Sequence, residues 1–129
     1  MANPIDLKYS KEHEWIKVNG NIGVVGVTDF AQKQLTDIVF VELPEKGKKV
    51  KQNKQMAVIE SVKSVSDVFS PVSGEIIEVN EKLKDSPDII NKDPYGEGWI
   101  AKLKLENKDE LNNLMPAEDY EDFIQEEKH

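Results

Sequence analysis

Residues 56–74, which read MAVIESVKSVSDVFSPVSG, decide the fold and contain its most informative side chain, Lys63. The flanks on either side, residues 56–62 and 64–69, are rich in β-branched side chains and contain neither Gly nor Pro, so each is predicted to be a strand. Only a tight turn fits between them, which puts Lys63 at a hairpin tip with its amine clear of the protein body. A turn lysine is most often only a solvated surface group, so this position alone assigns no function.

A second hairpin is predicted near the N-terminus. Residues 13–18 and 21–27 form its strands, and Asn19-Gly20 joins them because both residue types accept positive φ. Thr28-Asp29 then begins a short helix, in which Gln32 completes a capping box with Asp29.

Further elements follow along the chain. In order, we expect a strand at 38–43, a solvated lysine-rich edge at 46–54, a strand at 75–79, a helix at 81–85 capped by Asn80, a loop at 91–98, a strand at 99–105, a helical turn from Asn107 or Asp109, and a helix from Pro116. Tyr120, Phe123 and Ile124 share one face of the last helix, which should pack onto the strands.

About seven short strands separated by turns indicate a mainly β fold. We expect one domain spanning residues 1–129, built as a small β-sandwich or flattened barrel with short helices, including a C-terminal one.

Composition restricts the classes of function. The formal charge is −8 and all basic residues are Lys, which argues against a nucleic-acid partner. Cys is absent, and the two imidazoles, His13 and His129, lie at opposite ends of the chain, which argues against a metal site. No signal peptide, presequence or membrane helix is recognisable, so we expect a cytoplasmic protein without membrane contact.

Several longer strings resemble one family. ESVKSVSDVFSPVSGEI around Lys63 closely resembles the lipoate-attachment segment of the glycine cleavage H-protein family. Strings that begin at His13, Gly26, Asp37 and Asp93 (HEW, GVTD, DIVFVELP and DPYGEGW) resemble other segments of that family in the same order. Together these strings cover about residues 7–125.

The resemblance implies a fold of two antiparallel sheets with lipoate on Lys63 as a covalent amide. It also implies a non-catalytic carrier that shuttles the aminomethyl group of glycine from the P-protein (a glycine decarboxylase) to the T-protein (an aminomethyltransferase). The L-protein then reoxidises the arm, and a lipoate ligase or an octanoyl/lipoyl transferase modifies Lys63. Placing the chemistry in the bound group is how carriers work in general.

The resemblance assigns roles to three acids as well. Glu14 and Asp67 stand where the family would place contacts to the amine of the loaded arm, which shelters in a cleft of its own protein; a carboxylate is a suitable partner for that cation. Glu60, with Asp67, gives the hairpin acidic flanks for recognition by the modifying enzyme or partners. Phe30 stands where many relatives have His or Tyr, and Gln34 where some have a second His, which argues against a His-mediated contact to the arm and favours a more apolar helix face.

Three alternatives remain at this point. An enzyme using Glu14 with His13, or paired acids in the hairpin, would need a walled pocket that the sequence does not show. A relay that passes lipoate on to 2-oxoacid dehydrogenases would use the same lysine. A biotinyl carrier is a near relative, but it typically has Met on both sides of its lysine, where this chain has Val62 and Ser64.

Overall fold

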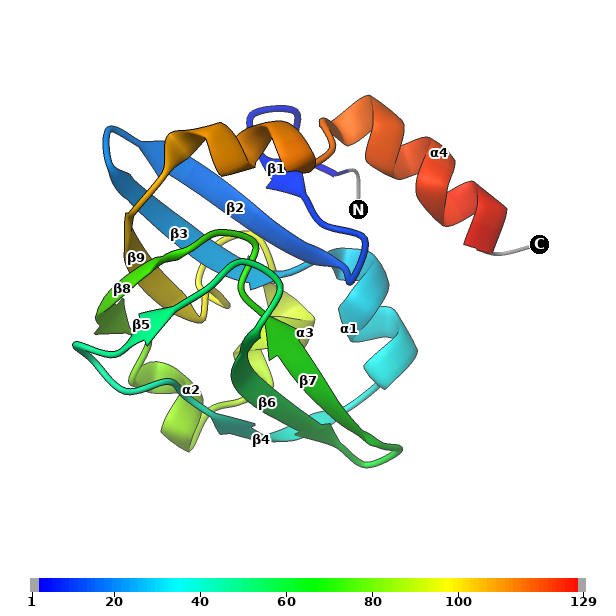
Figure 1. Ribbon diagram of the computed structural model, residues 1–129. Helices are drawn as coiled ribbons and strands as arrows, with labels where there is room; N and C mark the ends of the chain where they lie inside the picture. The colour runs from blue at the N-terminus through cyan, green and yellow to red at the C-terminus, as the bar shows by residue number, and fades with distance from the viewer. Residues whose placement is uncertain (1–2, 128–129) are drawn as a thin grey trace.

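The computed structural model describes residues 3–127 and contains two antiparallel sheets (Figure 1). The six-stranded sheet has the order β1-β2-β3-β9-β8-β5, and the three-stranded sheet has the order β4-β6-β7. The strands are β1 (Lys8–Tyr9), β2 (Glu14–Asn19), β3 (Ile22–Val27), β4 (Ile38–Glu42), β5 (Lys49–Val50), β6 (Gln55–Ser61), β7 (Val65–Phe69), β8 (Gly74–Val79) and β9 (Ala101–Leu105). The helices are α1 (Asp29–Leu35), α2 (Lys82–Asp85), α3 (Ile89–Lys92), the 3-10 helix η1 (Lys108–Asn113) and α4 (Ala117–Glu127).

The main core lies between the two sheets. Ile16 and Leu103 from the six-stranded sheet and Ile59 and Val68 from the three-stranded sheet belong to one buried cluster. The expected mainly β class is confirmed, and in the part of the chain that the structure describes neither sheet closes into a barrel. Alternation of buried and exposed residues along the strands produces this arrangement.

The first hairpin forms as predicted, but its turn lies one residue later. β2 continues to Asn19, which pairs with Ile22, so the two loop residues are Gly20 and Asn21. Only Gly20 has positive φ, at 64°. Glycine at the first central position is the arrangement of a type II′ turn, so both Asn19 and Ile22 stay in the ladder.

The capping box predicted for α1 is wrong, although the helix starts where expected. Thr28 is the N-cap, and its Oγ1 accepts a hydrogen bond from the Ala31 amide at 3.2 Å. The Gln32 side chain donates to the Asp29 carboxylate at 2.8 Å and does not reach back to the backbone. Asp29 is helical and therefore lies too late in the chain to act as the cap.

Two short elements in the second half differ from expectation. Asn80 does not cap α2; its side-chain amide donates to the carbonyls of Glu97 and Trp99, at 2.7 and 2.8 Å. α3 begins at Ile89, before the predicted loop at 91–98, and its last two residues, ending at Lys92, occupy the start of that loop. α2 forms within the helix predicted at 81–85, whereas the four residues of α3 carry too little periodicity to reveal it.

The C-terminal helix packs on a second cluster. Asn107 caps η1 by accepting from the Asp109 amide at 3.0 Å, as predicted. In α4, Tyr120 and Ile124 are buried against Tyr9 and the neighbouring strand β2, and Phe123 packs partly against the same cluster. This confirms the predicted apolar face of α4, which lies over the β1 edge of the larger sheet (Figure 1).

Candidate functional site

The lysine hairpin is the β6–β7 unit, and Lys63 lies at its tip, as predicted. β6 and β7 pair in register, with Glu60 opposite Val65. The three loop residues between the strands are exposed and extend beyond the core (Figure 1). Because the strands carry buried side chains on their inner face, the base of the hairpin is fixed while its tip is accessible.

Ser61 fixes the shape of this tip. Its Oγ accepts hydrogen bonds from the backbone amides of Lys63 and Ser64, at 3.1 and 3.0 Å, and its own amide donates to the Ser64 carbonyl at 2.8 Å. The Val62 amide donates to the Asp37 carbonyl at 2.9 Å, which ties the tip to the start of β4. The sequence signal, a Ser two residues before the lysine, is typical of a side chain that closes a turn.

A cleft of about 480 Å³ starts at the tip and follows β7. Its three walls are the hairpin, α1 and the turn between β1 and β2; the residues that line it are Glu12, His13, Ala31, Gln34, Leu35, Lys63–Asp67 and Phe69. Within residues 3–127 the Lys63 ammonium forms no ion pair. A flexible group attached there can therefore either extend into solvent or fold back along the cleft.

The three predicted acids occupy different places. Asp67 lines the cleft, and its Oδ1 accepts a hydrogen bond from the side-chain amide of Gln55 at 2.9 Å. Glu60 is half-buried, lies between Phe40 on β4 and Val65 on β7, and is not part of the cleft lining. Phe40 and Val65 are 50% and 65% exposed, so Glu60 belongs to a partly apolar outer surface of the hairpin sheet.

Glu14 is buried beneath the cleft. It is 2% exposed, its Oε1 accepts from the Ser10 hydroxyl, and its Oε2 accepts from the Phe69 amide at 3.0 Å. Burial raises the pKa of Glu14 to about 7, although both hydrogen bonds act in the opposite direction. The carboxyl group therefore anchors the end of β7 to the N-terminal turn and does not line the cleft.

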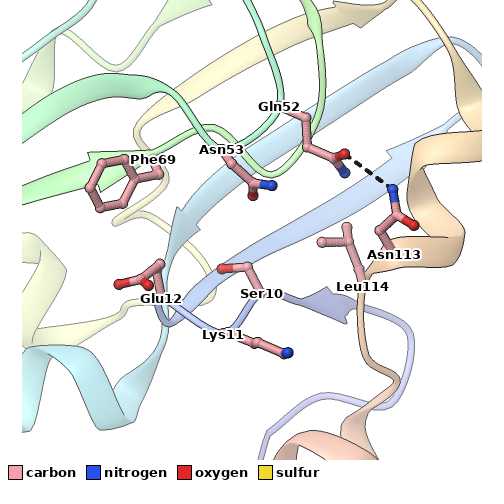
Figure 2. Close-up of a pocket in the computed structure, with 8 residues that line it drawn as sticks. All are labelled: Ser10, Lys11, Glu12, Gln52, Asn53, Phe69, Asn113 and Leu114. Carbon is pink, nitrogen blue, oxygen red and sulfur yellow. Dashed lines mark hydrogen bonds between the residues drawn. The ribbon is translucent and has the colours of Figure 1, made fainter.

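A second hollow of about 380 Å³ has Phe69 among its lining residues (Figure 2). It shares Glu12 and Phe69 with the cleft beside Lys63. Its remaining lining is mostly polar: Ser10, Lys11, Gln52, Asn53, Asn113 and Leu114. The Asn113 side-chain amide donates to the side-chain oxygen Oε1 of Gln52 at 3.1 Å, the contact drawn as a dashed line in Figure 2. Phe69 thus borders both hollows, a position that nothing in the sequence indicates.

The helix wall differs from the predicted one. Ala31, Gln34 and Leu35 face the cleft from α1. Phe30 does not line it, because its ring packs against His13, with ring centroids 4.6 Å apart. Phe30, which stands where many relatives have His or Tyr, therefore affects the packing behind the cleft. Gln34 places a polar side chain in the cleft wall itself.

These features define a class. An exposed lysine at the tip of an ordered hairpin, beside a cleft, is the arrangement expected of a carrier protein that presents one covalently bound group. Residues 7–127 match the family described as Glycine cleavage H-protein. The chain belongs to this family.

Relatives and a solved structure agree. The chain is 64% identical to the glycine cleavage system H protein of Symbiobacterium thermophilum over 98% of this chain and 99% of that one. It is 55% identical to the corresponding protein of Carboxydothermus hydrogenoformans, over 96% and 95%. A crystal structure of a glycine cleavage system H protein from Mycobacterium marinum aligns with a TM-score of 0.83 and 37% identity, over 92% and 95% of the two chains.

Family membership makes this chain a non-catalytic carrier component of the glycine cleavage system. The family carries lipoate and interacts with the enzymes of that system. Among residues 3–127, no group of three or more potential ligand side chains could hold a metal ion, and no helix is both long and apolar enough to cross a membrane. His129 lies outside the described residues.

Proposed function

We propose that Lys63 carries lipoate as an amide and that this chain, acting as one carrier domain over residues 1–129, transfers the aminomethyl group of glycine from the P-protein to the T-protein. The L-protein then returns the carrier to its oxidised form. The exposed lysine at the tip of the ordered β6–β7 hairpin carries this proposal. A modifying enzyme can reach the Lys63 amine without disturbing the core.

The residues around Lys63 fit the group. When bound, lipoate supplies a dithiolane that can be opened, loaded and closed again. The cleft begins at Lys63 and continues along β7 to Phe69, five residues from Ser64, a distance of about 16 Å at the rise of a β-strand. An extended lipoyl-lysine is of similar length, so the cleft can accommodate the folded-back arm.

Each of the three acids has a proposed task. Asp67 lines the cleft, so its carboxylate is available to pair with the amine of the cargo. A direct contact from Glu14 would require its carboxyl group to leave Ser10 or Phe69, since both oxygens are engaged. We therefore assign Glu14 to the same cargo contact only after such a rotation, and otherwise to holding Phe69 at the end of the cleft.

Recognition is assigned to the outer surface of the hairpin sheet. Glu60 lies there beside Phe40 and Val65, whose apolar side chains are half or more exposed. Apolar side chains next to a carboxylate suit a protein partner with a basic group at its rim. We propose that a lipoate ligase or an octanoyl/lipoyl transferase reads this surface when it modifies Lys63.

Intact mass spectrometry tests the attachment. The chain, a Lys63→Arg variant and a Lys54→Arg control are purified from cells supplied with lipoate; Lys54 is exposed and precedes the same hairpin. We expect the parent and the Lys54→Arg control to gain the mass of one lipoyl group and the Lys63→Arg variant to gain none. Absence of the added mass from the parent, with a competent ligase shown to be present, would refute the proposal.

A further inference from the structure

We infer that Tyr120 of α4 is a positioning residue for the arm cleft: its hydroxyl group connects two of the cleft walls through a chain of hydrogen bonds. The purpose of this connection rests on the proposed function of the cleft, but the connection itself is a property of the unmodified protein. Tyr120 is fully buried and does not line the cleft.

The hydrogen-bond chain has four links. The Ala31 amide donates to Thr28 Oγ1 at 3.2 Å, and Thr28 Oγ1 lies 2.8 Å from the Tyr120 hydroxyl oxygen. That oxygen lies 2.7 Å from His13 Nδ1, and His13 Nε2 lies 3.0 Å from a Glu127 carboxylate oxygen. All four distances are within the ordinary range for hydrogen bonds.

For a neutral imidazole the chemistry fixes the direction of every link. The Glu127 carboxylate only accepts, so His13 Nε2 carries the proton and Nδ1 accepts from Tyr120. The Tyr120 oxygen then accepts from the Thr28 hydroxyl group, whose oxygen accepts in turn from the Ala31 amide. Each hydroxyl group donates once and accepts once, so none of these polar groups is left unsatisfied.

Two members of this chain lie in different walls. His13 is part of the wall formed by the β1–β2 turn, and Ala31 is part of the wall formed by α1. Thr28 is the N-cap of α1, so its position fixes where the helix begins and which residues it turns toward the cleft. The Tyr120 hydroxyl group contacts the side chains of both Thr28 and His13, in addition to the direct backbone bond from the Thr28 amide to the His13 carbonyl.

Several contacts hold the turn wall. His13 has φ = 70°, a left-handed conformation that a non-glycine residue adopts only when its surroundings hold it there. Its amide donates to the Ser10 carbonyl at 3.1 Å, and its carbonyl accepts from the Thr28 amide at 3.0 Å. These backbone bonds fix the main chain, while Tyr120 and Phe30 fix the ring.

The Tyr120 ring is itself held rigidly by α4 packing. It stacks on Tyr9 with ring centroids 4.6 Å apart and an angle of 6° between the planes. Removing only the hydroxyl group should therefore leave the ring in place. Tyr9 provides a matched control, because its hydroxyl group donates to the Pro4 carbonyl at 2.5 Å and takes no part in the chain to the cleft.

The first experiment uses the unmodified protein. Amide hydrogen exchange is measured by NMR in the parent, in Tyr120→Phe and in Tyr9→Phe. We expect Tyr120→Phe to accelerate exchange at the amides in the first turn of α1, including Ala31 and Gln32, by about fivefold or more. That factor corresponds to the loss of roughly one hydrogen bond. Acceleration that is equal in Tyr9→Phe, or spread evenly over the core, would overturn the inference.

The second experiment uses the lipoylated protein with its arm reduced. The rate at which a thiol-alkylating reagent modifies the arm is compared among the same three proteins. We expect Tyr120→Phe to react about two- to fivefold faster than the parent and Tyr9→Phe to match the parent, by the same hydrogen-bond reasoning. Equal rates in all three would overturn the role in sheltering the arm. Failure of Lys63 to be lipoylated would instead be seen in the mass spectrum and would leave the exchange result unaffected.

Discussion

Replacing Glu14 by Gln should make the protein's stability less dependent on pH. The Glu14 carboxyl group is 2% exposed, and burial raises its pKa from 4.5 to about 7. Gln has nearly the same shape, so its carbonyl oxygen can still accept from the Phe69 amide. The substitution thus removes a titrating proton while retaining the contact that fixes the end of β7.

The sign follows from the direction of the pKa change. The folded protein holds this proton more tightly than the unfolded chain, so the contribution of Glu14 to stability is complete below pH 4.5 and is lost as the pH rises through 7. A pKa change from 4.5 to about 7 corresponds to about 3 kcal/mol in total. About 2 kcal/mol of this is lost between roughly pH 5.5 and 8.5, above the sequence pI of 4.8.

Urea unfolding at several pH values measures the effect. We expect the free energy of unfolding of Glu14→Gln, minus that of the parent, to rise by about 2 kcal/mol from pH 5.5 to 8.5. Glu45→Gln, at an exposed carboxylate in the turn before β5, serves as the control and should show no such rise. A difference that is constant with pH, or that falls, would refute the assignment of a buried, proton-binding carboxyl group at Glu14.

Two further substitutions test the hairpin and the sheet. Ser61→Ala removes the side-chain acceptor that closes the turn, so it should speed amide exchange at Lys63 and Ser64 and slow lipoylation. The free energy of unfolding should fall by only about 0.5–1.5 kcal/mol, because a single acceptor is lost. Unchanged exchange at both amides would count against this role. Gly74→Ala should lower the free energy of unfolding measured in urea by about 1–3 kcal/mol. The Cβ of the new alanine would lie 2.4 Å from the Lys104 carbonyl oxygen, across the β8–β9 pair. A loss below about 0.5 kcal/mol would mean that the two strands move apart at little cost in free energy.

Local signals predicted the elements that surround the site. The β-branched flanks of Lys63 became β6 and β7, and the Thr28-Asp29 string became the start of α1. Both signals act within a few residues, so the sequence alone contains the information that they need. The placement of Lys63 at the hairpin tip follows from them directly.

Features that depend on distant contacts were not predictable in this way. β5 has two residues and exists because Val50 pairs with Gly74. Asn80 has the right residue type for a cap, but carbonyls from the loop before β9 take its amide. The burial of Glu14 likewise depends on the end of β7, 55 residues later in the chain. Residue type and spacing do not specify which distant partner takes a polar group.

The position of Phe69 connects these observations. Its backbone amide is bonded to Glu14, and its side chain lines both the arm cleft and the neighbouring hollow. Protonation of Glu14 weakens a charge-assisted hydrogen bond to that amide, so the contact that holds the far end of the cleft depends on pH. The near end, at Ser61 and Lys63, depends on a neutral hydroxyl group and does not share this sensitivity. Under the proposed function, attachment of the arm and shelter of its cargo are therefore separable: substitutions at Ser61 should affect the first, and substitutions that remove the Glu14 acceptor of the Phe69 amide should affect the second.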